Sequence, residues 1–335
     1  MKVGLDAHTL RTLNLDPLGL LDQTIAHGLE GVHCSSGPLL SRDADYRARF
    51  IEKARTHNLY LELVGAGINP GRSGKSVAEL VADWEPLFPL AVEVGSPILN
   101  CCFGLFRERM FTSPTFAEQL ALTTQVLREL SKRGADNNVI ITVELHVDLT
   151  SLELRHLIET VDSPYVAVNL DTANALGLLE DPVEAAQNLL PYIRTTHLKD
   201  TCIYPTDEGY NWLGGAPLGR GLVDLPVIVD MLYRANPAIN LNIEDSGGFI
   251  AIPFYDAAFL QSFTDRTPQH MAQLTHYLWR GDQQVRAGLH PRPEESKAIN
   301  WAEVIPARLQ YNADYLRRLR DQVVARHAEQ PTQPA

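Results

Sequence analysis

The sequence predicts a (β/α)₈ barrel, or TIM barrel, with a long C-terminal helical extension. Short apolar runs rich in β-branched residues alternate with stretches of helical periodicity, and this unit recurs eight times within residues 1–246. Such a succession is typical of a closed parallel barrel. The rival fold is a doubly wound open sheet, which normally has a glycine-rich phosphate turn after its first strand. Here that turn reads HTLRTLNLDP and has no glycine.

Several of the expected strands are continuous apolar runs, as strands buried on both faces should be. They cover residues 2–8, 30–36, 59–67, 97–104, 138–146, 165–174, 195–200 and 239–246. Helical patterns fill the intervals, at residues 18–29, 43–58, 76–95, 115–136, 151–162, 181–193 and 225–236. The pairs Asp16-Pro17 and Asp181-Pro182 place an N-cap residue before a proline at the first helical position, which marks two of the helix starts.

Two segments exceed what a barrel requires. Residues 201–219 form an expected long loop, rich in aromatic residues and glycine, after the seventh strand. Long loops on this side of a barrel usually cover the active site. We expect one domain, whose parts are a barrel core at about 1–249, an extension at 250–327 with helices at 269–288 and 303–327, and a disordered tail at 328–335.

The composition excludes several classes of function. Apolar residues make up 45% and charged residues 21% of the chain, and the net charge is -12. An acidic surface repels phosphate backbones, so we expect no nucleic-acid partner, and no apolar run is long enough for a membrane helix. The start, MKVGLDAHTL, reads as a strand and not as a signal peptide. The four cysteines match neither a disulfide framework nor a zinc module. We therefore expect a cytoplasmic protein, either a homo-oligomer or one with a partner subunit.

Four polar residues follow four consecutive apolar strands of the second half. They are Glu144, Asp171, His197 and Glu244. Each lies at the carboxyl end of its strand, where a buried charge needs a partner. Three carboxylates and one imidazole at one rim suit a single divalent ion, either Mn²⁺, Mg²⁺ or Co²⁺, and Zn²⁺ is also allowed. The alternative is a network of buried ion pairs in which His197 is only a core histidine.

Two further residues share a strand face with these ligands. His146 lies two residues after Glu144, and Lys199 two residues after His197, so each points to the same side as the ligand before it. Either side chain could contact a substrate oxygen, or His146 could lie in a loop and Lys199 could pair with Asp200. Weaker candidates for the site or its surroundings are His8, His33, Cys34, Glu62, Asn169, Asn174, Tyr204, Tyr210, Trp212 and Arg220.

The motifs VELH, NLDTAN, HLKD, PLGRGLVD and NIED, in this order within residues 1–246, resemble those of the xylose isomerase-like TIM barrel superfamily, the sugar phosphate isomerase/epimerase group. The resemblance implies one bound divalent ion, often manganese, on Glu144, Asp171, His197 and Glu244. It also implies that Glu144 and Glu244 can act as acid and base. Plain ketose 3-epimerases carry an asparagine–arginine pair after the first glutamate and an arginine after the histidine. This chain has VDLT and Ile203 there, so that signature is incomplete.

The expected reaction is metal-dependent isomerisation or epimerisation of a sugar or keto-sugar. A cation on a carbonyl and its neighbouring hydroxyl acidifies the adjacent C–H, and a carboxylate removes that proton to give an enediolate held by the metal. Expulsion of a leaving group would instead make the enzyme a lyase of a keto-sugar or a sugar-derived keto-acid, namely a dehydratase, a decarboxylase or a keto-glycoside-cleaving enzyme, so the expected substrate is a small sugar or sugar acid. HLKD and the long extension resemble such branches of the group. A metal-dependent nuclease and a non-catalytic sugar-binding barrel are the remaining alternatives.

Overall fold

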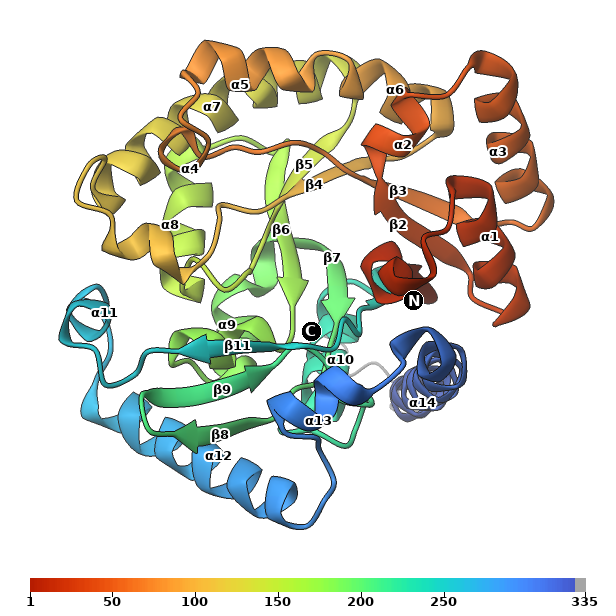
Figure 1. Ribbon diagram of the computed structural model, residues 1–335. Helices are drawn as coiled ribbons and strands as arrows, with labels where there is room; N and C mark the ends of the chain where they lie inside the picture. The colour runs from red at the N-terminus through yellow and green to blue at the C-terminus, as the bar shows by residue number, and fades with distance from the viewer. Residues whose placement is uncertain (329–335) are drawn as a thin grey trace.

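Eight parallel strands close into a barrel in the computed structural model, which describes residues 1–328 (Figure 1). Their order around the barrel is β1-β10-β7-β6-β5-β4-β3-β2. The predicted fold class is thereby confirmed, and each predicted strand overlaps one barrel strand, although the strand predicted at 195–200 begins two residues earlier, at Ile193. The strands are β1 Lys2–Asp6, β2 Gly31–Ser35, β3 Tyr60–Val64, β4 Ile98–Cys101, β5 Ile140–Glu144, β6 Val166–Asp171, β7 Ile193–Leu198 and β10 Asn240–Ile243.

Helices cover the outside of the barrel (Figure 1). The longer ones are α1 Pro17–Ala26, α3 Ala44–Thr56, α5 Val77–Trp84, α6 Leu87–Val94, α7 Phe116–Asn137, α8 Ser151–Val161, α9 Pro182–Leu189 and α10 Leu225–Ala235. Asp16 and Asp181 cap α1 and α9 as predicted. The single helix predicted at 76–95 is instead two, because Pro86 has no amide hydrogen and lies at the break.

Short helical turns link the strands to these helices at the carboxyl-terminal rim. They are η1 Ala7–Leu13, α2 Ser36–Leu40, α4 Pro70–Ser73, η2 Phe106–Met110 and η3 Asn174–Leu178, and η4 Leu190–Tyr192 precedes β7. Asp6 starts η1 by accepting a hydrogen bond from the backbone amide of His8. No helix in residues 1–328 is both long enough and apolar enough to cross a membrane.

The segment predicted as a long loop at 201–219 forms a hairpin in the structure. Its strands are β8 Ile203–Thr206 and β9 Gly209–Leu213, and β11 Phe249–Ile252 pairs with β9 to complete a three-stranded antiparallel sheet. The prediction missed this sheet because β11 is remote in sequence from β9, the strand with which it pairs. The sheet lies beside the ends of β6 and β7 (Figure 1), and Tyr210 and Trp212 donate hydrogen bonds to the carbonyls of Leu176 and Ala173.

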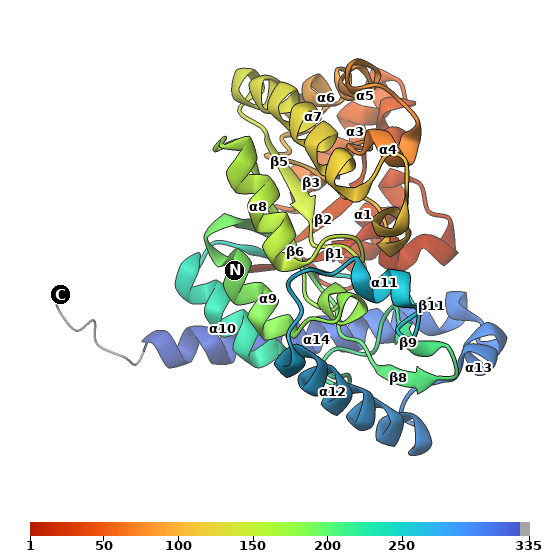
Figure 2. The same ribbon diagram turned by 90° about the vertical axis from the view of Figure 1, so that its left-hand side faces the viewer.

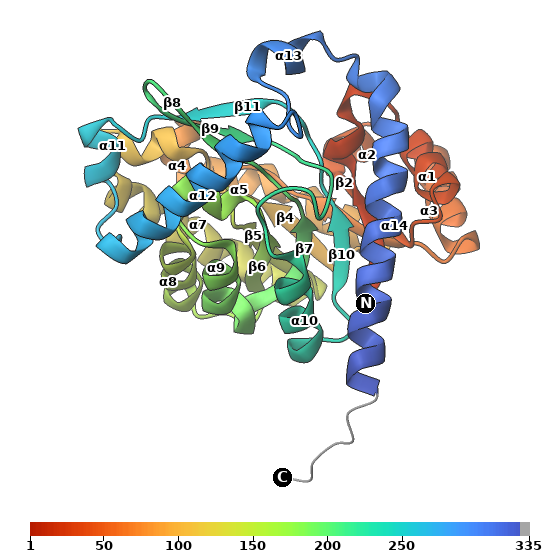
Figure 3. The same cartoon turned by 90° about the horizontal axis from the view of Figure 1, so that it is seen from below.

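The extension continues with α11 Ala257–Gln261, α12 Pro268–Arg286, α13 Pro293–Ala298 and α14 Trp301–Ala328. Helices α12 and α14 confirm the two that were predicted at 269–288 and 303–327. Helix α14 runs along the barrel (Figures 2 and 3) and contacts β1, β10, η1 and α10, so it is the closing helix of the barrel. Residues 247–300 are therefore an insertion between β10 and its helix. Of the expected tail, Ala328 is the last residue of α14, and residues 329–335 lie outside the described part.

Helix α12 packs on β8 through Gly281. A Cβ atom at this glycine would lie 1.8 Å from the carbonyl oxygen of Ile203. In an open helical position alanine is normally favoured over glycine by about 0.5–1 kcal/mol. Here the clash makes alanine destabilising instead, and we expect Gly281→Ala to lower the free energy of unfolding by about 1–3 kcal/mol. Gly37 in α2 meets nothing within 4 Å and provides the matched control, Gly37→Ala. Chemical denaturation that finds both variants at least as stable as the parent would contradict this packing.

Candidate metal centre

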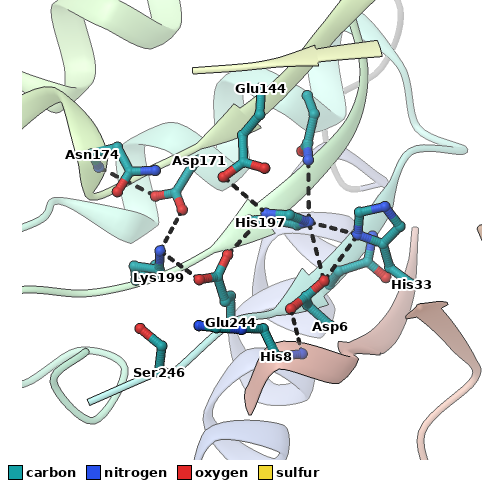
Figure 4. A network of polar contacts seen from close by, with 12 residues as sticks. Asp6, His8, His33, Glu144, Asp171, Asn174, His197, Lys199, Glu244 and Ser246 are labelled. Carbon is teal, nitrogen blue, oxygen red and sulfur yellow. Dashed lines mark hydrogen bonds and ion pairs between the residues drawn. The ribbon is translucent and has the colours of Figure 1, made fainter. Parts of the chain in front are cut away.

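The structure brings the four predicted ligands together at the carboxyl-terminal end of the barrel (Figure 4). Glu144 and Asp171 end β5 and β6, His197 lies in β7, and Glu244 follows β10 directly. These four strands are neighbours in the barrel, so their ends meet at one rim. One ligand atom from each residue lies within 4.8 Å of all the others, and all four residues are buried. His197 Nδ1 is 2.9 Å from Glu244 Oε2 and 3.4 Å from Glu144 Oε1.

Lys199 lies within this cluster. Its ammonium nitrogen is 2.7 Å from Asp171 Oδ2 and 2.7 Å from Glu244 Oε1, and its side chain is 3% exposed (Figure 4). Lys199 therefore reaches the ligand carboxylates, and the alternative of a pair with Asp200 is wrong. Asp200 instead accepts hydrogen bonds from backbone amides of the PLGRGLVD turn, including those of Gly219 and Gly221.

The pKa values in the cluster are set by burial and by the contacts of its carboxylates with Lys199 and His197. Burial acts to raise the pKa of Glu144, but the facing His197 imidazole outweighs it and lowers that pKa to about 2. Burial raises the pKa of Asp171 to about 6, against the opposing effect of Lys199. Burial acts to lower the pKa of Lys199, yet Asp171 and Glu244 raise it above its ordinary value. In the absence of a metal, Lys199 and His197 thus supply the positive charge that the three carboxylates require.

The other ring nitrogen of His197 is also held. His197 Nε2 lies 2.6 Å from His33 Nδ1, 3.4 Å from Asp6 Oδ2 and 3.1 Å from Asn169 Nδ2 (Figure 4). These contacts direct Nδ1 of His197 toward the carboxylates, the arrangement that commonly orients a metal-binding histidine. The sequence analysis listed His33 as a weak candidate and missed Asp6. Asp6 ends β1, so the rule that found the four ligands also applies to it.

Hydrogen bonds orient the carboxylates from behind. The backbone amides of Ala173 and Asn174 donate to Asp171 Oδ1, which leaves Oδ2 facing the centre. The side-chain amide of Asn100 donates to Glu144 Oε2. The side chain of Asn174 donates to the carbonyl of Leu145 and does not contact a ligand side chain. Asn100 was missed by the sequence analysis, since an asparagine inside a strand gives no distinct signal.

A cavity of about 500 Å³ opens beside the cluster. Glu144, His197 and Glu244 form part of its wall, together with His146. The Nδ1 atom of His146 is 2.8 Å from the carbonyl oxygen of Gly104, so this ring lines the cavity without joining the four ligands. His8, Arg11, His33, Cys34 and Cys102 also line it. A larger hollow of about 1010 Å³ lies among residues of α9, α12 and the start of α10 and contains none of the four ligands.

The remaining candidates lie away from this cavity. Glu62 is buried inside the barrel and accepts hydrogen bonds from Thr195, Asn240 and Asn242, so it is neither in a salt bridge nor in the cavity wall. Tyr204, Tyr210 and Trp212 are buried in the small sheet. Of these, Trp212 is adjacent to the site, because the Lys199 nitrogen lies 5.6 Å from its ring centre. Arg220 is exposed and donates to the hydroxyl of Tyr311.

The donor set fits a divalent cation. His197 Nδ1 and Asp171 Oδ2 are both buried and face the other ligand atoms, with ion-pair contacts to Glu244 and Lys199 as their partners. Carboxylate oxygens with one imidazole nitrogen suit Mn²⁺, Mg²⁺ or Co²⁺, and Zn²⁺ is compatible with the same set.

Comparison with known proteins adds to this geometry. Residues 21–248 match the family model of the xylose isomerase-like TIM barrel. The uncharacterized protein YihM of Escherichia coli is 25% identical over 215 residues, which are 63% of this chain and 60% of YihM. The 3-oxo-isoapionate decarboxylase of Pectobacterium atrosepticum is 28% identical over 147 residues, 42% of this chain and 51% of the decarboxylase. The matches thus span about half to three fifths of these relatives.

Solved structures share the fold. A structure of L-ribulose 3-epimerase superposes with a TM-score of 0.62 at 14% identity and covers 99% of both chains. A xylose isomerase-like TIM barrel protein from Mycobacterium smegmatis, in complex with magnesium, has a TM-score of 0.55 at 17% identity and covers 78% of this chain and 88% of its own. The IOLI protein with a bound zinc atom has a TM-score of 0.58 at 18% identity, with 84% and 99% covered. At these identities the likeness establishes the fold alone.

Proposed function

Because the chain belongs to the xylose isomerase-like TIM barrel family, we propose that it is a divalent-metal-dependent isomerase or epimerase of a sugar or keto-sugar. The observation that carries the proposal is the meeting of Glu144, Asp171, His197 and Glu244 in one cluster, of which Glu144, His197 and Glu244 form part of a cavity wall. A cavity of about 500 Å³ is large enough for a monosaccharide. Buried carboxylates beside a cavity are also the groups that proton transfer at carbon requires.

The four ligands would hold the ion, with Mn²⁺ as the first expectation. The bound ion would polarise a carbonyl and so make the neighbouring C–H more acidic. Glu144 and Glu244 are the proposed acid and base, since both reach the cavity from different sides of His197. Removal of the proton by one carboxylate and its return from the other face inverts the carbon, and its return to the neighbouring carbon exchanges aldose and ketose.

Lys199 and His146 are the other proposed catalytic residues. The ammonium of Lys199 orients Asp171 and Glu244 and, when a metal ion takes over their charge, becomes available to a substrate oxygen. The His146 side chain is 29% exposed and lies at the cavity wall, where it can bind a substrate hydroxyl. The burial of the cluster keeps bulk water from the reacting carbon, which strengthens each of these electrostatic contacts.

The second candidate is a lyase in the same site. The relative named as a decarboxylase supports it, because loss of CO₂ beside a carbonyl produces the same kind of carbanion as proton removal. The buried Lys199 ammonium beside the cluster would stabilise such a carbanion after conjugation to an oxyanion. The two candidates differ in product, so measured release of CO₂, water or an aglycone separates them.

We also propose that the protein is a cytoplasmic homo-oligomer, with a partner subunit as the alternative. Large exposed apolar side chains of the extension support association. Tyr255, Trp279 and Leu289 have exposed fractions of 62%, 60% and 65%. Exposed aromatic groups of this kind are enriched at protein interfaces.

Metal analysis and solvent exchange test the proposed function. The purified protein should hold about one divalent ion per chain. Incubation in D₂O should transfer deuterium to the carbon beside the carbonyl of an accepted keto-sugar, and chelation followed by reloading with Mn²⁺, Mg²⁺, Co²⁺ or Zn²⁺ should abolish and restore this exchange. Failure of the protein to retain any of these ions, or exchange that is indifferent to chelation, would refute the proposal.

A further inference from the structure

We propose that Arg11 forms a carboxylate-binding subsite at the mouth of the metal cavity, and that the substrate is accordingly an oxidised sugar of the aldonic or keto-aldonic acid class. This inference deepens the proposed function and rests on it for the reaction, but the subsite itself can be tested by binding alone. The sequence analysis did not select Arg11, because a lone arginine in a loop after a strand carries no distinct signal.

Arg11 extends from a platform that the barrel fixes in place. It belongs to η1, which follows β1 at the same rim as the four ligands, and it lines the same cavity as Glu144, His197 and Glu244. Thr9, two residues earlier, donates to the carbonyl of Ile243 and accepts from the backbone amide of Asp245, so η1 is tied to the segment that carries Glu244. Helix α14 also packs on η1. The backbone of η1 at Arg11 is therefore held in place beside the segment that carries Glu244.

The guanidinium of Arg11 has no acidic partner within the described residues. Its single hydrogen bond is a long one of 3.4 Å to the carbonyl of His8, and no carboxylate lies within ion-pair distance of it in residues 1–328. The carboxylates that act most strongly on the charge of Arg11 are those of Glu244 and Asp245. Both already have cationic partners. Glu244 pairs with Lys199 and His197, and Asp245 pairs with Arg308. Arg11 is exposed, so its guanidinium is solvated and accessible to an anionic ligand.

The surroundings of Arg11 favour a single negative charge on the ligand. Arg11 is the one arginine among the residues that line the cavity, and the nearby Lys199 ammonium is held by Asp171 and Glu244. A guanidinium binds a carboxylate through two parallel hydrogen bonds, whereas a phosphate dianion would require further cations or backbone amides. The apolar side chains of Leu10, Leu15 and Leu20 line the same cavity. Deeper in the cavity, Glu144 and Glu244 would repel a second anionic group.

This arrangement orients the substrate. A sugar acid would place its carboxylate at Arg11 and its carbonyl and hydroxyl oxygens toward the four ligands. A carboxylate that is held by a guanidinium is stabilised as an anion and is not the group that leaves as CO₂. The subsite therefore favours proton transfer on a sugar acid, and it predicts that the acid group is used for recognition.

Binding of aldonates and alditols tests the subsite without relying on catalysis. The probes are gluconate and its uncharged counterpart sorbitol, titrated calorimetrically into the full-length protein loaded with Mn²⁺ and, separately, into the metal-free protein. We expect gluconate to bind more tightly than sorbitol. Arg11→Gln should weaken gluconate binding by about 10- to 100-fold, the scale of a lost charge-assisted hydrogen bond, and leave sorbitol binding and manganese content unchanged. Arg11→Lys should retain part of the preference.

Arg220→Gln is the matched control, since Arg220 is exposed, lies outside the cavity and contacts only Tyr311; it should keep the parent's preference. Equal affinity of the parent for gluconate and sorbitol, or a preference that survives in Arg11→Gln, would overturn the subsite. An aldonate preference that depends on Arg11 in a protein that shows no metal-dependent exchange would sustain the subsite and refute the proposed reaction instead.

Discussion

Glu244→Gln is expected to lose most of its metal affinity and to slow deuterium exchange into an accepted keto-sugar by about 10²–10³-fold or more, the scale of losing one preorganised electrostatic contact. The amide is uncharged and a weaker ligand than the carboxylate. It also leaves both neighbours of Glu244 without their partner, because Oε1 faces Lys199 and Oε2 faces His197. Equilibrium dialysis of the metal and exchange measured by NMR give the two readouts separately.

Glu180→Gln is the matched control for this change. Glu180 is also a buried glutamate, 3% exposed, and accepts hydrogen bonds from Ser151, but it does not line the metal cavity. Burial raises its pKa to about 7, against the opposing effect of Arg266 at 3.7 Å. This variant should bind metal and exchange deuterium like the parent. Metal affinity that is unchanged in Glu244→Gln, or reduced equally in both variants, would argue against Glu244 as a ligand.

The barrel and the meeting of the four ligands could be predicted from sequence for one physical reason. Parallel strands with covered faces are continuous apolar runs, and all their carboxyl ends lie at one rim. A polar residue that ends such a run must therefore lie at that rim, as Glu144, Asp171 and Glu244 do. Neither register nor side-chain detail was required. That these residues bind a metal remains a prediction, which the metal affinity of Glu244→Gln tests.

Other contacts of the site could not be predicted, because they join segments that are remote in sequence. His33 on β2 meets His197 on β7 across the barrel end, and Asp6 on β1 joins them. Nothing in the local pattern of GVHCS distinguishes a histidine that reaches across the barrel from one that packs within its own layer. The small sheet over the site was missed for the same reason, since β11 pairs with β9 over a separation of a whole strand–helix unit. Periodicity reports local structure, and these contacts are long-range.

Lys199→Met is expected to destabilise the metal-free protein by about 3–5 kcal/mol, the usual cost of removing one partner from a buried ion pair. Methionine keeps the length and apolar contacts of the side chain, and it leaves Asp171 and Glu244 buried without their cation. The exposed pair of Lys132 with Glu129 provides the control, and Lys132→Met should change stability by no more than about 1 kcal/mol. Thermal unfolding of the chelated proteins measures both effects.

Addition of Mn²⁺ should stabilise Lys199→Met more than it stabilises the parent protein. A divalent ion can supply the charge that Lys199 supplied, so the melting temperature of Lys199→Met should rise more on metal addition than that of the parent. If Lys199 also contacts the substrate, the metal-saturated variant should still exchange deuterium about 10²–10⁴-fold more slowly, the range of a lost acid–base contact. Full recovery of exchange with metal would assign Lys199 to charge balance alone. A smaller metal response in the variant than in the parent would mean that the cation does not bind between Asp171 and Glu244, and the ligand assignment would have to be abandoned.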